Sequence, residues 1–148
     1  VSYSQEHHFV LLLCWKIREG IKQNIEVKRI ANYTLFFFDN DLQLHFAEEE
    51  KCLFGKLNDD DVFKQRAVKE HNEINAMIKN FRSGNTTHEQ LNTFANLLDN
   101  HIRFEERILF NHIQQILSED ELKVMPKHER NNNEDIDKKW TDCFWEKK

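Results

Sequence analysis

Residues that form tight turns are almost absent from this chain, which has three glycines and one proline among its 148 residues. A chain with so few turn formers makes few connections, so its secondary structure must consist of a few long elements. Apolar residues recur at spacings of three and four, which is the period of an amphipathic helix, and no segment shows the alternation of a strand. We therefore predict an all-α protein with short connections.

Four long helices are predicted, separated by polar clusters or glycine. Their approximate ranges are 4–23, 25–57, 62–81 and 86–117. The third follows a cluster of aspartates, and Thr86 to Glu89 forms a capping box for the fourth. Such helices favour an antiparallel up-down-up-down four-helix bundle.

We expect a single domain over residues 1–148, with the bundle at about 4–117 and a short helical extension at about 118–148. The aromatic end of that extension, from Trp140 to Trp145, is expected to fold back onto the bundle.

Charge and hydropathy exclude several classes of protein. The net charge of -5 and the lack of a dense basic stripe argue against a nucleic-acid partner. The longest apolar run, Phe9 to Trp15, is too short for a membrane span, and the first 20 residues lack the layout of a signal peptide. Three cysteines without a C-x-x-C pair indicate reduced thiols. We expect a cytoplasmic monomer or weak homo-oligomer.

One pattern occurs twice, as HFAEEEKCLF at 45–54 and as HIRFEERILF at 101–110. Residues four apart lie above one another on one helix face, about 6 Å apart along the axis. His45 with Glu49, and His101 with Glu105, are therefore vertical pairs. Both pairs are predicted to point inward, because they share stripes with apolar residues. These residues are Phe38 and Cys52 in the second helix, and Leu98 and Ile108 in the fourth.

The other two helices each add an inward histidine. His71 shares a stripe with Ile74 and Ile78. In the first helix the candidates are His7 and His8, and we favour His7 because an apolar stripe extends back to it. That stripe consists of Val10, Cys14, Ile17 and Ile21.

Unpaired imidazoles and carboxylates in an apolar core would cost several kcal/mol for each group. Any one of them alone fits a hydrogen-bonded core residue, but the whole set favours a metal centre built from inward side chains of all four helices. The predicted ligands are His7, His45, Glu49, His71, His101 and Glu105. Iron, manganese and zinc all accept these donors. Surface or bundle-end positions are expected for His8, His88, His112 and His128, and core positions for Cys14 and Cys52.

These motifs resemble the hemerythrin-like (HHE cation-binding) domain family, over residues 4 to about 117. The resemblance rests on Glu6-His7-His8, His45-x-x-x-Glu49-Glu50, Glu70-His71 and His101-x-x-x-Glu105-Glu106, and the opening EHHFVLLLCWKIREG looks like a bacterial subgroup. It implies a non-haem di-iron centre bridged by Glu49 and a carboxylate of the fourth helix. By the same resemblance, His71 and His101 serve one iron, and His7 and His45 serve the other.

The chain departs from the oxygen carriers of this family at two positions. Asn75 stands where they have a further histidine, and both Glu105 and Glu106 are available where they have one aspartate. We prefer Glu105 because it repeats the spacing of His45 and Glu49. The missing imidazole leaves a coordination position for water, a substrate or a carboxylate such as Asp41 or Glu48.

Two functions are compatible with this centre. The first is a protein that binds or senses O2, NO or iron. The second is a redox enzyme acting on O2, peroxide or NO, with electrons from an external reductant or from the Cys14 or Cys52 thiol. The chain has no flavin or nicotinamide fingerprint, which favours binding.

Overall fold

The computed structural model describes residues 2–52, 54–117 and 140–146, with side chains from residue 7 onward. Within these ranges the regular structure is helical, and none of the helices is long and apolar enough to cross a membrane. The elements in chain order are α1 (Ser2–Lys22), α2 (Val27–Phe37), the π-helical turn η1 (Phe38–Leu42), α3 (Gln43–Cys52), the 3-10 turn η2 (Phe54–Lys56), α4 (Val62–Arg82), α5 (His88–Phe104), the π-helical turn η3 (Glu105–Leu109) and α6 (Phe110–Ile116).

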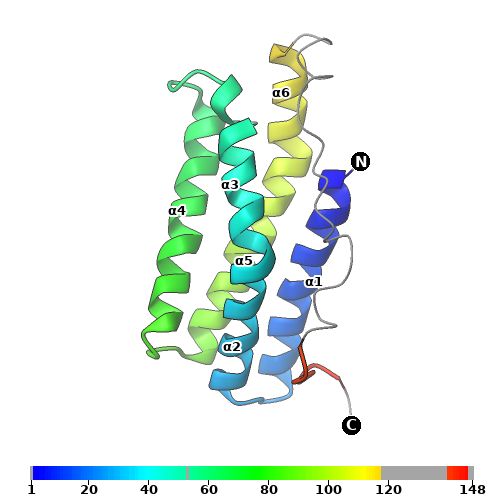
Figure 1. Ribbon diagram of the computed structural model, residues 1–148, viewed down its shortest axis with the longest axis vertical. Helices are drawn as coiled ribbons and strands as arrows, with labels where there is room; N and C mark the ends of the chain where they lie inside the picture. The colour runs from blue at the N-terminus through cyan, green and yellow to red at the C-terminus, as the bar shows by residue number, and fades with distance from the viewer. Residues whose placement is uncertain (1, 53, 118–139, 147–148) are drawn as a thin grey trace.

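These elements form four long helical rods that run antiparallel to one another (Figure 1). The rods are α1, then α2 continued by η1 and α3, then α4, and finally α5 continued by η3 and α6. The first rod packs against the second and the fourth, and α4 completes the ring by packing against α2 and α5. This arrangement confirms the predicted all-α four-helix bundle.

Side-chain caps fix where two of the helices begin. The Asp61 carboxylate accepts hydrogen bonds from the Phe63 and Lys64 amides at 2.9 and 3.1 Å, which starts α4 where it was predicted to start. The capping box of α5 lies one residue later than predicted, because Thr87 has the extended backbone of an N-cap and pairs with Gln90.

A π-helical turn interrupts each of the two rods that carry the duplicated pattern. Such a turn adds one residue to the helical repeat and rotates every residue after it on the helix face. Ile108 was predicted to point inward with His101 and Glu105, and this prediction is wrong, since its side chain is 39% exposed. Leu109 is fully buried in its place.

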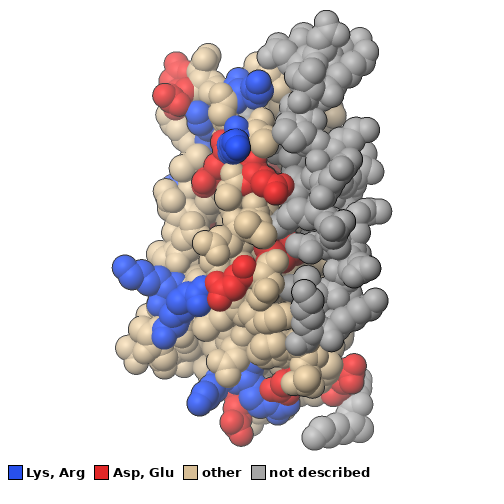
Figure 2. Space-filling view, viewed as in Figure 1, with Lys and Arg blue, Asp and Glu red and all other residues tan. Residues whose placement is uncertain are grey.

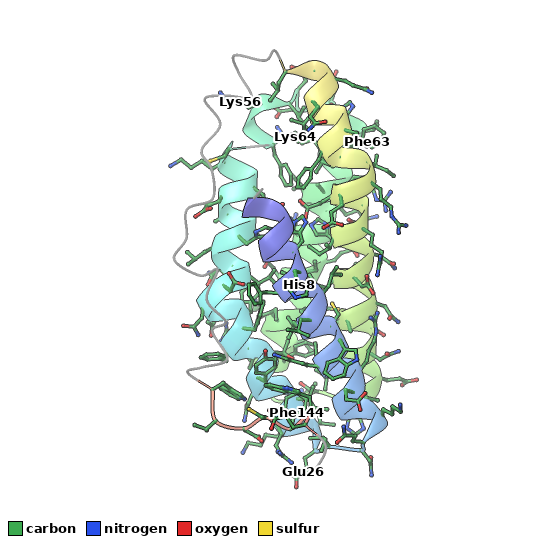
Figure 3. All side chains as sticks on the ribbon, turned by 90° about the vertical axis from the view of Figure 1, so that its right-hand side faces the viewer. His8, Glu26, Lys56, Phe63, Lys64 and Phe144 are labelled. Atoms are coloured by element: carbon green, nitrogen blue, oxygen red, sulfur yellow. The ribbon has the colours of Figure 1, made fainter. Side chains whose placement is uncertain are left out.

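The aromatic tail packs against the end of the bundle formed by α1 and α2. Phe144 is buried, and the ring of Trp145 lies 4.8 Å from that of Tyr33. The Arg29 guanidinium donates to both oxygens of Asp142 at 2.9 and 2.6 Å. Figure 3 shows Phe144 at the same end of the molecule as Glu26, as the predicted fold-back requires. The helix expected from residue 118 lies outside the described residues.

The buried side chains of the described residues form two apolar clusters rather than one. The larger cluster extends from Ile30 and Phe144 at the tail end to Val10, Phe46 and Ile102 beside the buried histidines. The smaller cluster fills the other end and contains Phe54, Leu57, Ala67, Phe104, Leu109, Ile113 and Leu117. The buried histidines and glutamates of the other three rods lie where the larger cluster gives way to the smaller one, and His7 precedes the first residue of the larger cluster in α1. A polar layer therefore divides the core.

Candidate metal centre

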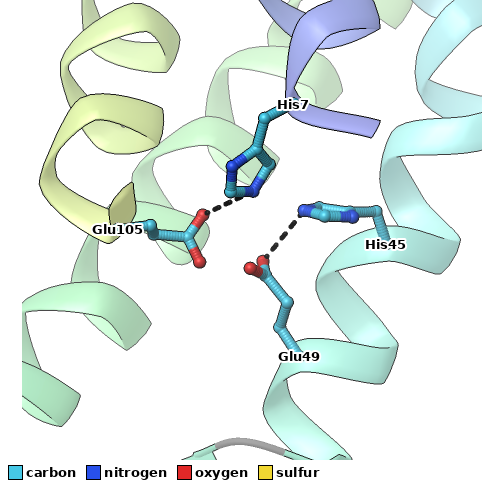
Figure 4. Close-up of side chains that lie close together, drawn as sticks. All are labelled: His7, His45, Glu49 and Glu105. Atoms are coloured by element: carbon cyan, nitrogen blue, oxygen red, sulfur yellow. Dashed lines mark ion pairs between the residues drawn. The ribbon is translucent and has the colours of Figure 1, made fainter. Parts of the chain in front are cut away.

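Side chains from all four rods meet in the polar layer. They are His7 of α1, His45 and Glu49 of α3, His71 of α4, His101 of α5 and Glu105 of η3. Each is at most 1% exposed. The structure thus brings together all six residues that the sequence predicts as ligands, and Figure 4 shows four of them converging from three rods.

Their donor atoms form two groups that share both carboxylates. One group contains His7, His45, Glu49 and Glu105, and the other contains His71, His101, Glu49 and Glu105. In each group the potential ligand atoms lie within 4.8 Å of one another.

Each shared carboxylate lies between one imidazole of each group. Glu49 Oε1 is 3.4 Å from both His45 Nε2 and His71 Nε2. Glu105 Oε1 is 3.1 Å from His101 Nε2 and 3.7 Å from His7 Nε2. This arrangement is the one expected of carboxylates that bridge two ions.

Three of the histidines donate their other ring nitrogen to an outer carboxylate. Nδ1 of His7 lies 3.2 Å from Glu106 Oε1, and Nδ1 of His71 lies 3.1 Å from Glu50 Oε1. A carboxylate can only accept, so each Nδ1 carries a proton and each Nε2 is left to face the centre. Glu50 and Glu106 occupy equivalent positions in the duplicated pattern, directly after the two shared glutamates.

His101 is held in the same way by Glu70, which is not among the predicted ligands. Its Nδ1 donates to Glu70 Oε1 at 2.8 Å, and the other oxygen of Glu70 accepts from Arg66 Nε at 3.2 Å. Glu70 and His101 belong to different rods, α4 and α5, so no spacing within one helix relates them.

The buried carboxylates lack the partners that a metal-free core would need. Both oxygens of Glu49 and both oxygens of Glu105 are buried without a hydrogen bond in the part of the chain that the structure describes. The nearest imidazole nitrogens lie 3.1 to 3.7 Å from their Oε1 atoms, and a proton on such a nitrogen offsets only part of the carboxylate charge. Buried carboxylates that are neither hydrogen-bonded nor neutralised are costly, and metal ions would compensate them. The donor set therefore fits a cation centre.

In the metal-free protein, bound protons supply part of the positive charge that metal ions would bring. Burial acts to lower the pKa of His101, but Glu105 and Glu70 outweigh it and raise the pKa to about 10. Burial, followed by the charge of Glu49, raises the pKa of Glu105 to about 7. Burial also acts to raise the pKa of Glu49, yet the neighbouring imidazoles, led by His45, hold it well below its ordinary value.

The other residues that the sequence offered as possible ligands lie outside the two ligand groups. His8 is exposed, whereas His7 lies in the centre. Asp41 is buried one turn before His45 but belongs to neither ligand group. Glu48 is partly buried and Asn75 is exposed, and neither belongs to a ligand group.

The remaining histidines within the described ranges have structural contacts. The His88 ring lies 2.7 Å from the Ile25 carbonyl, and His112 Nε2 lies 2.5 Å from Asp61 Oδ2 at the start of α4. His128 lies outside the described residues.

The cysteines Cys14, Cys52 and Cys143 are all free. Cys14 is fully buried, and burial raises the pKa of its thiol to about 12.

An antiparallel four-helix bundle with two histidine and glutamate groups in its core defines a class of helical metal-binding proteins. Within this class, the chain belongs to the hemerythrin HHE cation binding domain family, whose model matches residues 3–113. No curated protein and no solved structure matches the chain. Membership of the family shows that the domain binds cations, and the buried groups described above fit that role.

Proposed function

We propose that this protein is a non-haem di-iron protein that binds or senses a small molecule, O2 or NO, or iron itself. Glu49 and Glu105 would bridge the ions, with His7 and His45 on one ion and His71 and His101 on the other. The observation that carries this proposal is the sharing of both carboxylates between the two ligand groups. Two separate mononuclear sites would have no need to share them.

Iron fits the donors, and open coordination positions supply the chemistry. Imidazole and carboxylate ligands together suit iron, although manganese and zinc also accept them. Each group offers two imidazoles and two shared carboxylates, so an ion bound there keeps positions for an external ligand. When bound, the iron pair supplies a redox-active centre to which a small diatomic molecule can attach.

The protein's own residues hold the centre in place and exclude water from it. Glu50, Glu70 and Glu106 fix the ring orientation of three histidines through their Nδ1 atoms. The apolar clusters on both sides keep the surroundings dry, which strengthens the attraction between the carboxylates and a cation.

A redox enzyme acting on O2, peroxide or NO with an external reductant is the second candidate. It is favoured by the exposure of Glu106 and Glu50, at 40% and 45%, because these carboxylates connect His7 and His71 to solvent. Such contacts could pass the protons that turnover consumes. Cys14 is a poor source of electrons for it, since burial raises the pKa of its thiol to about 12.

Metal analysis combined with optical spectroscopy tests the proposal. Protein from iron-replete cells should contain about two irons per chain, the number that two ligand groups predict. Charge-transfer bands should appear on adding air or NO to the reduced protein. Reversal of the bands under argon supports binding, whereas peroxide consumption with a reductant supports the enzyme. Less than one metal per chain after reconstitution would refute both functions.

A further inference from the structure

A pocket of about 380 Å³ opens between α3 and α4, next to one half of the centre. The residues of its lining used below are Phe46, Glu50, Asn75, Lys79 and Arg82. None of the six predicted ligands lines it, so the pocket is separate from the centre itself.

Phe46 forms the wall between this pocket and the centre. Its ring is stacked on that of His71, with centroids 3.9 Å apart and planes at 18°. The same ring meets His101 edge-on at 5.6 Å. Phe46 thus covers both imidazoles of one ligand group on the side that faces the pocket. A rotation of this one side chain would connect the pocket with the two rings.

Two polar residues of the lining are tied to His71. Glu50 accepts the hydrogen bond of His71 Nδ1 and also borders the pocket. Asn75 follows His71 by one helical turn, and its exposed side chain borders the pocket instead of entering the centre. The pocket is therefore adjacent to the ligand group that contains His71 and His101.

Basic side chains line the pocket's α4 side. The Arg82 guanidinium pairs with Asp39, while Lys79 has no carboxylate partner among the described residues. Figure 2 shows basic side chains gathered over the lower half of α4, beside acidic ones. An unpaired ammonium at the rim raises the local concentration of anions.

We propose that this pocket admits small anions of two or three heavy atoms to the centre, and that Phe46 is the gate. The proposal rests on the metal centre proposed above, because that centre is where the anion would bind. The route itself depends on this chain's own residues and can be tested with and without metal.

A matched control exists on the opposite side of the centre. The ring of Phe110 is parallel to that of His7, with centroids 5.6 Å apart and planes at 8°, so it lies over one imidazole of the other ligand group at a greater distance than Phe46 lies over His71. Substitutions at Phe46 and Phe110 therefore remove similar rings from opposite sides. Phe46→Leu and Phe110→Leu keep most of the apolar volume, so they are the variants of choice should the alanine variants fail to fold.

The first test measures the rate at which azide binds to the iron-loaded protein by stopped-flow absorbance. Phe46→Ala should raise this rate about tenfold, equivalent to about 1.4 kcal/mol in the barrier. Phe110→Ala should leave it within about twofold. Lys79→Gln should lower the azide rate at low salt and leave the rate for uncharged NO unchanged, because steering acts on charged ligands. Acceleration by Phe110→Ala alone, or by neither variant, would overturn the proposal.

The second test needs no metal. Deuterium exchange at the Cε1 carbon of each histidine ring, read by mass spectrometry of peptides, reports access of solvent to that ring. In the metal-free protein, Phe46→Leu should accelerate exchange at His71 while His7 stays unchanged, and Phe110→Leu should do the reverse. Equal exchange of His71 in wild type and Phe46→Leu would show that Phe46 is no barrier. Failure to load metal would refute the proposed centre, whereas this result would refute the gate.

Discussion

Glu49→Gln and Glu50→Gln should separate a shared ligand from its neighbour in the sequence. Both substitutions replace a carboxylate with an amide of nearly the same shape. Glu49 is fully buried and belongs to both ligand groups, so the change removes an anionic donor from both ion positions. Glu50 is exposed and acts on the centre through a single hydrogen bond to His71.

The expected magnitudes follow from linkage between metal binding and folding. At a free metal concentration 100 times the dissociation constant, binding stabilises the wild type by about 2.7 kcal/mol. For a domain of this size that is roughly 5–10 °C in Tm. Loss of an outer hydrogen bond lowers metal affinity about 10-fold to 100-fold. With a tenfold loss, Glu50→Gln should keep about half of the stabilisation, about 1.4 kcal/mol.

Glu49→Gln should lose nearly all of it. A loss of affinity of about 100-fold or more leaves about 0.4 kcal/mol at the same metal concentration, close to 1 °C. Thermal unfolding followed by circular dichroism, with each variant compared with its own metal-free form under anaerobic Fe(II), measures these shifts. Bound iron is measured in parallel. Equal losses in the two variants would show that the assignment of the two helix faces is wrong.

Three further outcomes are expected. Metal binding at pH 7 should release about 1.5 protons or more. In the metal-free protein, His101 has a pKa of about 10 and holds one proton, and Glu105 has a pKa of about 7 and holds about half of one. Calorimetry in buffers of different ionisation enthalpy would count the released protons. The release should fall toward one proton at pH 9, where Glu105 is ionised, and heats independent of buffer would contradict the pKa shifts. Cys14 should react with iodoacetamide at pH 8 far more slowly than the partly buried Cys143, because burial raises the pKa of the Cys14 thiol to about 12. Mass spectrometry of labelled peptides measures both rates, and equal rates would refute this expectation. Glu70→Gln should lower metal affinity about 10-fold to 100-fold, whereas Glu73→Gln, one turn away, should leave it unchanged. Competition with a chelator measures both affinities, and equal affinities of the two variants would contradict this expectation.

The vertical pairs could be predicted from the sequence because their geometry is local. His45 and Glu49, and likewise His101 and Glu105, are four residues apart, and the helical repeat alone puts both members on one face. Glu105 is the first residue of η3, so the regular repeat still applies to it. The prediction failed three residues later at Ile108, because a π-helical turn depends on the packing of the whole core rather than on a local preference.

The outer contacts required tertiary information. Glu50 and Glu106 could be anticipated as groups outside the centre from the duplicated pattern. Their partners, His71 and His7, come from other rods, and no spacing within one helix relates them. The same holds for Phe46, whose contact with His71 depends on how α3 and α4 are packed.

The division of the core by the polar layer has a consequence for how the chain comes apart. Among the described residues, the larger apolar cluster contains 20 buried residues and the smaller one seven, so most of the buried apolar surface that they contribute lies on the tail side of the layer. Between the two clusters lie two buried carboxylates, Glu49 and Glu105, which repel each other and which the imidazoles neutralise only in part unless cations are bound. Metal ions would therefore couple the unfolding of two cooperative units of unequal size. In their absence, we expect the end formed by η2 and α6 to open locally while the rest of the bundle remains folded.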